Sequence, residues 1–450
     1  MKEQEILTKL ATTGCRKIKF AVCDIDGILR SKTIHFDKIK NNINREIGFC
    51  DVIFGWDSND ECYSPNDFTG WHTGYPDQTC RLDSDTFRQI PWDQQTPFFL
   101  ADFSHQVNRF IPCPRTLLKK IIRQAADLDY KALFGAEFEW MNFQSFPGGT
   151  PEALITNPVP ITSGMFGYSQ TRPMHYREYF NQLFTDLANF DIPLESLHTE
   201  TGPGVYEAAI GYDQVLQAAD KATLFKSSVK EIALQHRITA SFMARWNEQL
   251  PGCGGHLHQS LQGVTGKTNL FGKTNHPEKP NTLTQNYMAG LLHCLPEILP
   301  MYAPTINSYK RLKSGSWAPT TASWGTDNRT VAVRYIPGDS PSATHIELRV
   351  PGADINPYLA MAASLASGLY GIKHQLKLPD ESLGNAYTQK APKLSKNLSE
   401  ATQKMKQSKL SSELFGADFV RHFCQSREWE WLKFEKAVTN WEINRYLEII

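Results

Sequence analysis

Three short stretches of this sequence alternate polar side chains with apolar ones. They are GAEFEW at 135–140, GGHLHQSL at 254–261 and IELR at 346–349. Side chains two residues apart on a β-strand point to the same face, so each stretch predicts a strand with two polar groups on one side. We therefore expect a sheet that carries charged side chains on one face and apolar side chains, packed in a core, on the other.

The pair Glu137 and Glu139 needs positive charge nearby, because two adjacent carboxylates repel each other. A fourth segment, HTETGPGVYEAAI, places Glu200 and Glu207 on either side of a Gly-Pro-Gly turn, so that they can converge. Taken singly, a strand glutamate usually faces solvent and a lone histidine is usually a hydrogen-bonded core residue. Their recurrence in pairs instead predicts a site for divalent cations, and its oxygen-rich composition suits Mg²⁺ or Mn²⁺ better than zinc. The candidate ligands are Glu137, Glu139, Glu200, Glu207, Glu347, His256 and His258.

Four arginines in the last third of the chain form a second group of candidate site residues. Arg311, Arg329 and Arg334 lie in NSYKRLKSGSWAPTTASWGTDNRTVAVRYIP, and Arg349 follows in IELRVPG. Arginine carries a permanent charge on a planar fork that matches carboxylate and phosphate. Any one of them could be an ordinary surface residue, but four beside a carboxylate cluster indicate an anionic substrate that carries phosphate.

Composition excludes several other classes of protein. The 450 residues have a formal net charge of zero, which leaves no basic excess to bind nucleic acid. Nine scattered cysteines without a CxxC pair favour a reducing compartment over a disulfide framework or a structural zinc site. The first residues lack the apolar core of a signal peptide, and NPYLAMAASLASGLYGI is short for a membrane span. We expect a soluble cytoplasmic protein, with that last segment as a buried, closely packed helix.

The order of segments predicts two domains. Residues 16–35 read as a hairpin around an Asp-Gly turn, and residues 50–105 are rich in loop-forming Pro, Gly and Asp. Pro114 suits the first turn of a helix whose apolar face includes Leu117, Leu118 and Ile121. We therefore expect a small β-rich domain over residues 1–110 and a larger domain of helices and strands over residues 111–450.

Several motifs together resemble those of the glutamine synthetase family, in its type I-like form. They are GAEFEW, ETGPGVYEAAIGY, GCGGHLHQSL, NSYKRL, WGTDNRTVAVR and IELRVPGADINPYLAMAASLASGLYGI, which run from about residue 130 to 372. The N-terminal DIDGILRSKTI is similar too. The resemblance implies an α+β fold, with a β-grasp domain over 1–110. Over 111–450 it implies a catalytic domain of curved antiparallel strands that form an open barrel flanked by helices.

The resemblance also implies roles for individual residues. The first metal would be bound by Glu139, Glu200 and Glu207, and the second by Glu137, His256 and Glu347. The backbone of Gly252 and the side chains of Arg311 and Arg349 would bind glutamate. Arg329 would steady the transferred phosphoryl group. Contacts to ATP would come from Glu195, Tyr212, His258, Ser260 and Arg334.

The implied activity is that of an ATP-dependent ligase, which joins the γ-carboxylate of L-glutamate to ammonia or an organic amine through a γ-glutamyl phosphate. ATP would be the co-substrate and two or more Mg²⁺ or Mn²⁺ ions the cofactors. The family commonly forms dodecamers with sites shared between subunits, so we expect a homo-oligomer. One alternative is a catalytically silent relative with a structural or regulatory role. Another takes CDIDG as an aspartyl-phosphate phosphatase motif, although the usual continuation of that motif is absent.

The chain departs from the family pattern where the amine should bind. Members that make glutamine carry a glutamate in the loop after Lys-Arg-Leu, and Trp317 stands at that place. Indole cannot accept a proton, but it could attract an ammonium group or line a pocket for a larger amine. Asp57, or its rival Asp60, could complete the amine site of a neighbouring subunit. Tyr387 lies near the position that the family modifies.

Milder departures lie close to the implied nucleotide contacts. Gly204-Val205 replaces the usual Gly-Gln of the acidic turn. Arg245 and His345 stand where the family has a lysine and an arginine.

Overall fold

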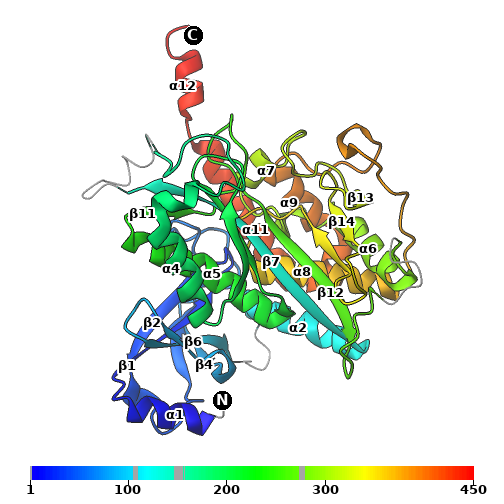
Figure 1. The fold of residues 1–450 in the computed structure, drawn as a ribbon. Helices are drawn as coiled ribbons and strands as arrows, with labels where there is room; N and C mark the ends of the chain where they lie inside the picture. The colour runs from blue at the N-terminus through cyan, green and yellow to red at the C-terminus, as the bar shows by residue number, and fades with distance from the viewer. Residues whose placement is uncertain (1–2, 105–109, 146–155, 157, 273–278) are drawn as a thin grey trace.

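The computed structural model describes residues 3–104, 110–145, 156, 158–272 and 279–450. Two β-sheets form the framework, and helices cover them (Figure 1). The smaller sheet lies in the N-terminal part, at the lower left of Figure 1, and the larger sheet crosses the rest of the molecule. The smaller sheet contains, in spatial order, β2 (Leu29–His35), β1 (Lys17–Cys23), β6 (Thr96–Phe103), β4 (Asp77–Leu82) and β3 (Ile47–Cys50), with β5 (Arg88–Ile90) beside β6.

The predicted N-terminal hairpin is confirmed. β1 and β2 pair antiparallel from Lys17 opposite His35 to Cys23 opposite Leu29. Asp24 closes the turn, because its Oδ1 accepts hydrogen bonds from the backbone N–H groups of Asp26 and Ile28 at 3.0 and 2.9 Å. Its other oxygen accepts a hydrogen bond from Arg30 at 2.8 Å. Both carboxylate oxygens of Asp24, the first aspartate of the CDIDG motif, therefore accept hydrogen bonds from within the hairpin.

The segment at 50–105 holds more regular structure than its composition predicts. β4, β5 and β6 all lie in its second half. These strands are short and separated by turns, so each one gives little periodic signal of its own. The prediction of a loop-rich segment is correct for residues 55–76 and wrong for most of residues 77–103.

Alternation along β1 divides the core between two clusters. Ile18, Phe20 and Val22 face a small cluster with α1, whereas Ala21 and Cys23 face the large core of the rest of the molecule. The small sheet is thus packed on both faces. Arg115 of α2 (Pro114–Asp127) also links the two parts, because it donates hydrogen bonds to Asp220 of α5 (Val215–Gln235) and to Asp102 of β6.

The larger sheet is almost entirely antiparallel, and among the described residues only β13 (Trp324–Thr326) and β14 (Val333–Ile336) pair in parallel. The long central strand β7 carries pairing partners on both sides. This arrangement confirms the predicted α+β class. The strands are, in spatial order, β13 (Trp324–Thr326), β14 (Val333–Ile336), β15 (His345–Leu348), β12 (Gly255–Gly263), β7 (Tyr130–Gln144), β9 (Val205–Ile210) and β8 (Leu194–Thr199), with β10 (Asp213–Gln214) and β11 (Ile238–Ser241) also paired to β7.

The helices pack mainly on the outer, apolar face of this sheet (Figure 1). As predicted, a helix begins at Pro114, and it buries Leu117, Leu118 and Ile121. The helices are α1 (Glu3–Thr12), α2 (Pro114–Asp127), α4 (Arg177–Asn189), α5 (Val215–Gln235), α6 (Thr282–Cys294), α7 (Ser308–Arg311), α8 (Pro357–Lys373), α9 (Leu398–Gln407), α10 (Lys409–Phe415), α11 (Ala417–Lys436) and α12 (Asn440–Tyr446). Short 3₁₀ helices are η1 (Phe36–Lys38), η2 (Asp51–Phe54), η3 (Ser84–Thr86), η4 (Arg172–Tyr176), η5 (Leu299–Met301) and η6 (Ala386–Thr388).

The apolar segment near residue 360 forms the predicted buried helix, α8. It packs closely against α6 through glycine. A Cβ atom on Gly290 would lie 2.1 Å from the carbonyl oxygen of Ser367, and one on Gly371 would lie 2.1 Å from that of Asn286. Side chains at these positions would push the two helices apart. Within the described part of the chain, no helix combines the length and the apolar character needed to cross a membrane.

The predicted boundary between residues 110 and 111 follows directly on 105–109, which lie outside the described residues. Cys113 packs in the small cluster, and α2 begins at the next residue and packs in the large one. The exact limits of the two domains stay a prediction.

Candidate functional site

The register of the large sheet brings the polar pairs of the sequence into one row. Glu347 of β15 lies opposite His258 of β12, and His256 lies opposite Glu137 of β7. On the other side of β7, Glu139 lies opposite Glu207 of β9. Cross-strand neighbours and residues two apart on a strand share a face, so all these side chains lie on the inner face of the curved sheet.

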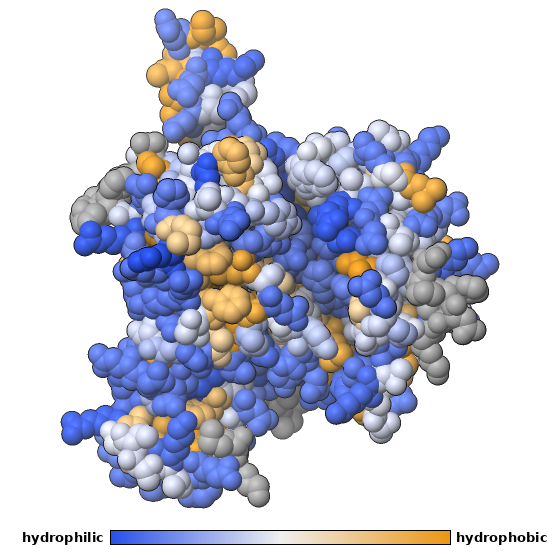
Figure 2. Space-filling view, viewed as in Figure 1, coloured by the Kyte–Doolittle hydropathy of each residue, from blue (hydrophilic) through white to orange (hydrophobic). Residues whose placement is uncertain are grey.

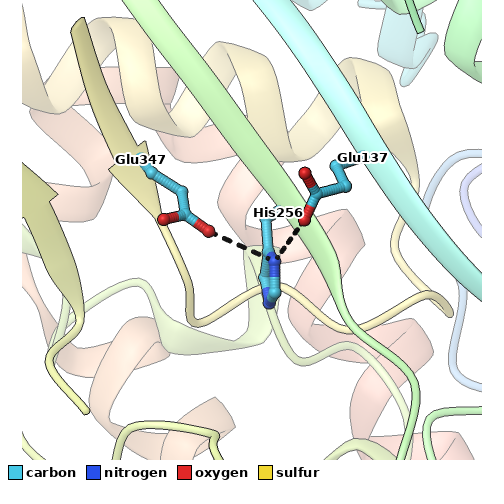
Figure 3. A group of neighbouring side chains, drawn as sticks. All are labelled: Glu137, His256 and Glu347. Atoms are coloured by element: carbon cyan, nitrogen blue, oxygen red, sulfur yellow. Dashed lines mark hydrogen bonds and ion pairs between the residues drawn. The ribbon is translucent and has the colours of Figure 1, made fainter. Parts of the chain in front are cut away.

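The first cluster contains Glu137, His256 and Glu347, which converge from three neighbouring strands (Figure 3). His256 Nδ1 lies 3.1 Å from Glu137 Oε1 and 3.3 Å from Glu347 Oε1. One ligand atom from each residue lies within 4.8 Å of the others. These are the three residues that the family resemblance assigns to the second metal.

The second cluster contains Glu200, Glu207 and His198. His198 Nε2 lies 3.6 Å from Glu200 Oε2 and 3.5 Å from Glu207 Oε1. His198 was not among the candidates from the sequence. It follows the same rule as the others, since His198 and Glu200 are two residues apart at the end of β8 (Leu194–Thr199), and the alternating His-Thr-Glu could have identified it.

Glu139 belongs to neither cluster in the structure, although it is placed between them. Its Oε2 accepts a hydrogen bond of 2.9 Å from the backbone N–H of Gly254. Burial raises the pKa of Glu139, and the charge of Glu200 adds to that effect, while His256 and Arg311 oppose it. Charges in both clusters therefore act on the carboxylate of Glu139.

Positive charge balances the first cluster. Arg334 Nη1 donates to Glu347 Oε2 at 3.1 Å, and Arg349 Nη1 donates to Glu347 Oε1 at 2.5 Å. Burial acts to raise the pKa of this carboxyl, but the charge of Arg349, helped by the two histidines of β12, lowers it to about 2. Glu347 is therefore an anion at every physiological pH.

Negative charge dominates the second cluster. Burial raises the pKa of Glu207 to about 10, and the carboxylates of Glu137, Glu139 and Glu200 add to this shift. His198 Nε2 is buried without a hydrogen-bond partner among the described residues. Crowded carboxylates with an imidazole nitrogen that lacks a partner are a donor set that fits a hard divalent cation.

The arginines assigned to glutamate lie beside the first cluster. Arg311 is buried, and its Nη2 lies 3.2 Å from His256 Nε2. Gly252 packs against Arg311, since a Cβ there would lie 3.0 Å from the Arg311 Cγ. Arg349 Nε donates to the carbonyl oxygen of Arg329 at 3.2 Å, while the side chain of Arg329 is exposed. The structure thus places Arg311, Arg334 and Arg349 in contact with the first cluster, and it holds the backbone of Arg329 beside Arg349.

A cavity of about 450 Å³ opens at the other end of the first cluster. Glu137 and His258 form the part of its wall that is shared with the cluster. Four of the five residues assigned to ATP line it: Glu195, Tyr212, His258 and Ser260. The fifth residue, Arg334, does not line the cavity but contacts Glu347. The sequence missed Lys267, which also lines the cavity and lies in a segment without a periodic pattern.

Comparison with known proteins agrees with this geometry. Residues 112–446 match the family described as glutamine synthetase, catalytic domain. The chain belongs to the glutamine synthetase family.

Two curated members of the glutamine synthetase family show how similar the chain is to its relatives. It is 45% identical over 454 residues to type-1 glutamine synthetase 2 of Dictyostelium discoideum, covering 100% of this chain and 87% of that protein. It is 37% identical over 441 residues to glutamate–isopropylamine ligase of a Pseudomonas species, covering 96% and 95% of the two chains. A solved structure of GmaS in complex with ADP matches with a TM-score of 0.84 at 25% identity, covering 98% of this chain and 99% of that one.

The departure at Trp317 has a clear structural form in this glutamine synthetase family member. The indole is 66% exposed, and its backbone has φ +59°, in the left-handed region that bulky residues rarely adopt. The backbone carbonyl of Trp317 accepts a hydrogen bond from Arg349 Nη2 at 3.4 Å. Strained backbone of this kind is typical of functional loops. The loop therefore holds an exposed aromatic ring near the predicted glutamate contacts.

Asp57 and Asp60 are tied to other parts of the chain. Asp57 accepts hydrogen bonds from the backbone of Asn59 and Glu61 at 2.9 and 3.0 Å, and its Oδ2 accepts one from Trp429 Nε1 at 2.8 Å. Asp60 accepts a hydrogen bond from Arg30 Nη1 at 2.6 Å. A role for either aspartate in the amine site of a neighbouring subunit stays a prediction.

The remaining departures from the family pattern have local roles. Arg245 donates to the carbonyl oxygens of Asn247, Glu248 and Lys310 at 3.1, 2.7 and 2.9 Å, and so fixes a loop. His345 lines the cavity beside His258, with their ring centroids 5.2 Å apart.

Proposed function

We propose that this chain is an ATP-dependent ligase that joins the γ-carboxylate of L-glutamate to an amine through a γ-glutamyl phosphate. The observation that carries the proposal is the single sheet face on which both carboxylate–imidazole clusters lie, between a cavity for the nucleotide and a group of arginines for glutamate. Membership of the glutamine synthetase family supports the same reaction class.

The reaction needs charge neutralisation and alignment more than covalent help from the protein. The γ-phosphoryl group of ATP passes to an oxygen of the glutamate γ-carboxylate, and ADP leaves. The amine nitrogen then attacks the carbonyl carbon, the bond from that carbon to the phosphate oxygen breaks, and the nitrogen loses a proton. Alignment of the two substrates supplies up to about 7–11 kcal/mol.

We assign the residues of the row to these tasks. One divalent cation, Mg²⁺ or Mn²⁺, would be held by Glu139, Glu200 and Glu207, with His198 as a further donor. A second would be held by Glu137, His256 and Glu347. Such cations supply positive charge at the transferred phosphoryl group when bound.

Arginines and the cavity complete the assignment. Arg329 is free to reach the phosphoryl group, because its side chain is exposed while its backbone is fixed by Arg349. Arg311, Arg349 and Gly252 bind glutamate. Glu195, Tyr212, His258, Ser260 and Arg334 bind ATP.

The acceptor is an organic amine in this proposal, and ammonia is the alternative. Trp317 supports the organic amine, because its exposed ring cannot accept a proton from ammonium and offers apolar surface instead. The likeness to glutamate–isopropylamine ligase supports it too, although the likeness to type-1 glutamine synthetase 2 favours ammonia.

The proposal extends to assembly and compartment. We propose a homo-oligomer, as in the family, in which Asp57 of one subunit approaches the amine site of the next. Nine cysteines that are all free support a reducing compartment such as the cytoplasm. Light scattering on the purified chain tests the first part, and a mass equal to one chain would contradict it.

Phosphate release tests the activity. The assay contains ATP, Mg²⁺ and glutamate, with a panel of amines that includes ammonium. Release that requires both glutamate and an amine supports the ligase. A preference for ammonium would defeat the argument from Trp317 but leave the ligase standing. No release with any acceptor would favour the silent structural or regulatory relative.

A further inference from the structure

A second cavity, of about 570 Å³, lies at the β8 edge of the large sheet. Tyr168, α4 (Arg177–Asn189) and β8 (Leu194–Thr199) form its walls, and we call it the Tyr168 groove. Figure 2 shows apolar side chains gathered in the region of α4 and α5, with smaller apolar groups elsewhere on the same face. Met174 is 62% exposed beside this groove, so its apolar surface is open to a ligand.

His198 joins the Tyr168 groove to the second cluster. Its Nε2 faces Glu200 and Glu207 at 3.6 and 3.5 Å, while its ring also lines the groove. The ring of Tyr168 stacks on that of His198, with centroids 4.5 Å apart and an angle of 15° between the planes. A molecule in the groove would therefore touch the two rings that border the carboxylates.

The chemistry of the groove restricts what it can bind. Phe180, Leu197 and Met174 supply apolar surface, and the polar members Ser169, Gln170 and Asn181 carry no charge. Within the described residues, Arg177 is the only lining residue with a permanent charge, and no carboxylate lines the groove. An alkyl or aryl group gains from this surface, whereas an ammonium group would meet a guanidinium and find no counter-charge.

We propose that the Tyr168 groove binds the substituent of the acceptor amine, and that the preferred acceptors are monoamines with an apolar or aromatic substituent rather than diamines or polyamines. This inference rests on the proposed ligase function. The amine nitrogen would point past Tyr168 and His198 towards the row, and the substituent would lie on Met174, Phe180 and Leu197. The volume of the groove lies within the range of pockets for small ligands.

The test compares n-pentylamine with 1,5-diaminopentane. Both have a chain of five carbon atoms, and the second carries one more terminal ammonium group. We expect kcat/KM for n-pentylamine to exceed that for the diamine by at least about tenfold, which corresponds to about 1.4 kcal/mol. Met174→Asp places a carboxylate in the groove, so we expect this ratio to fall by about tenfold or more.

Leu234→Asp is the matched control. Leu234 is an apolar residue of α5 (Val215–Gln235), 67% exposed and outside the lining of the groove, so the same charge is added elsewhere. We expect this variant to keep the wild-type ratio. Thermal unfolding of both variants shows that they are folded, as their exposed positions predict.

Four results would overturn the inference. They are an equal or greater rate with the diamine, turnover with ammonium but with neither organic amine, the same ratio in both variants, and a change in oligomeric mass of Met174→Asp without a change in the ratio. The last result would mean that a second copy of the chain covers the groove. Absence of phosphate release with every amine and with ammonium would remove the proposed function itself, and the four results above all leave it standing.

Discussion

The hydroxyl of Tyr387 donates a hydrogen bond to the carbonyl oxygen of Ala318 across 3.0 Å. Ala318 follows Trp317, whose own carbonyl accepts a hydrogen bond from Arg349. The loop that carries the exposed indole is thus held from two sides, by a predicted glutamate-binding arginine and by a tyrosine 69 residues further along the chain. The orientation of Trp317 depends on both contacts, because its backbone lies in the strained left-handed region.

Loss of the Tyr387 hydroxyl should weaken binding of the amine selectively. Tyr387→Phe removes one hydrogen bond, worth about 1 kcal/mol, and frees one side of the Trp317 loop. We expect KM for the amine to rise about three- to tenfold, with KM for ATP unchanged, since no residue of this loop lines the cavity proposed for the nucleotide. Steady-state kinetics with each substrate varied in turn measures the effect.

Tyr446→Phe serves as the control for that variant, because Tyr446 lies on α12, which projects from the body of the molecule (Figure 1). It should leave all three KM values unchanged. If Tyr387→Phe gave the same KM for the amine as the wild type, the hydrogen bond to Ala318 would have no part in placing the loop.

A carboxylate at position 317 should favour ammonium. Trp317→Glu supplies a charge-assisted hydrogen bond to a small cation, worth about 1.5–3 kcal/mol, and removes apolar surface from a larger amine. We expect the ratio of kcat/KM for ammonium to that for n-pentylamine to rise by about tenfold or more. Trp317→Gln keeps the new size without the charge, so it should give a much smaller rise. Equal shifts in the two variants would show that bulk alone decides the preference.

The sequence predicts the site better than it predicts the contacts between distant segments. Alternation with a period of two is a local property of a strand, so Glu137 and Glu139, or His256 and His258, could be assigned to one face without a structure. Register is not local. That Glu139 lies opposite Glu207, and Glu207 opposite His198, depends on how three strands align, which the sequence does not show.

Backbone strain and long-range ion pairs also leave no signal in the sequence. Nothing near Trp317 predicts its φ of +59°, because that value is imposed by the contacts of the loop with Arg349 and Tyr387. The pairing of Arg115 with Asp220 likewise joins residues 105 positions apart. Charged side chains are paired when they are buried, but the sequence does not show which residues form each pair.

The half-buried Lys226 should make stability depend on pH. Burial lowers the pKa of Lys226 to about 7, and the nearby Lys230 adds to this shift. In the unfolded chain a lysine has a pKa of about 10.4, so between about pH 7 and pH 10 the unfolded state binds one more proton than the folded state. The free energy of unfolding therefore rises with pH in this window, by at most about 1.4 kcal/mol per pH unit from this group.

Lys226→Met removes that contribution. We expect the free energy of unfolding of the variant, relative to the wild type, to fall steadily as the pH rises from about 7 to about 10, measured by urea denaturation. Lys377→Met, at an exposed position, should run parallel to the wild type. A difference between Lys226→Met and the wild type that stays constant with pH would show that Lys226 remains charged in the fold.

Binding of a divalent cation should release a proton from the second cluster. In the absence of a cation, the pKa of Glu207 is about 10 because burial and the neighbouring carboxylates disfavour its charge, so it is protonated at about pH 7.5. A cation needs the carboxylate, and the proton must leave. We expect about one proton released per cation at this site, and an affinity for Mg²⁺ that rises by up to about tenfold per pH unit below pH 10. Calorimetry in two buffers with different ionisation enthalpies counts the protons.

Two variants separate the clusters in that experiment. Glu207→Gln has no proton to lose, so cation binding should weaken and the proton release should disappear. Glu347→Gln should also weaken binding but keep the proton release, because the pKa of Glu347 is about 2 and its carboxylate is already an anion. The two glutamates belong to one row and differ mainly in their neighbours, since arginines face Glu347 and carboxylates face Glu207. Equal proton release in both variants would mean that the released proton comes from a group other than Glu207.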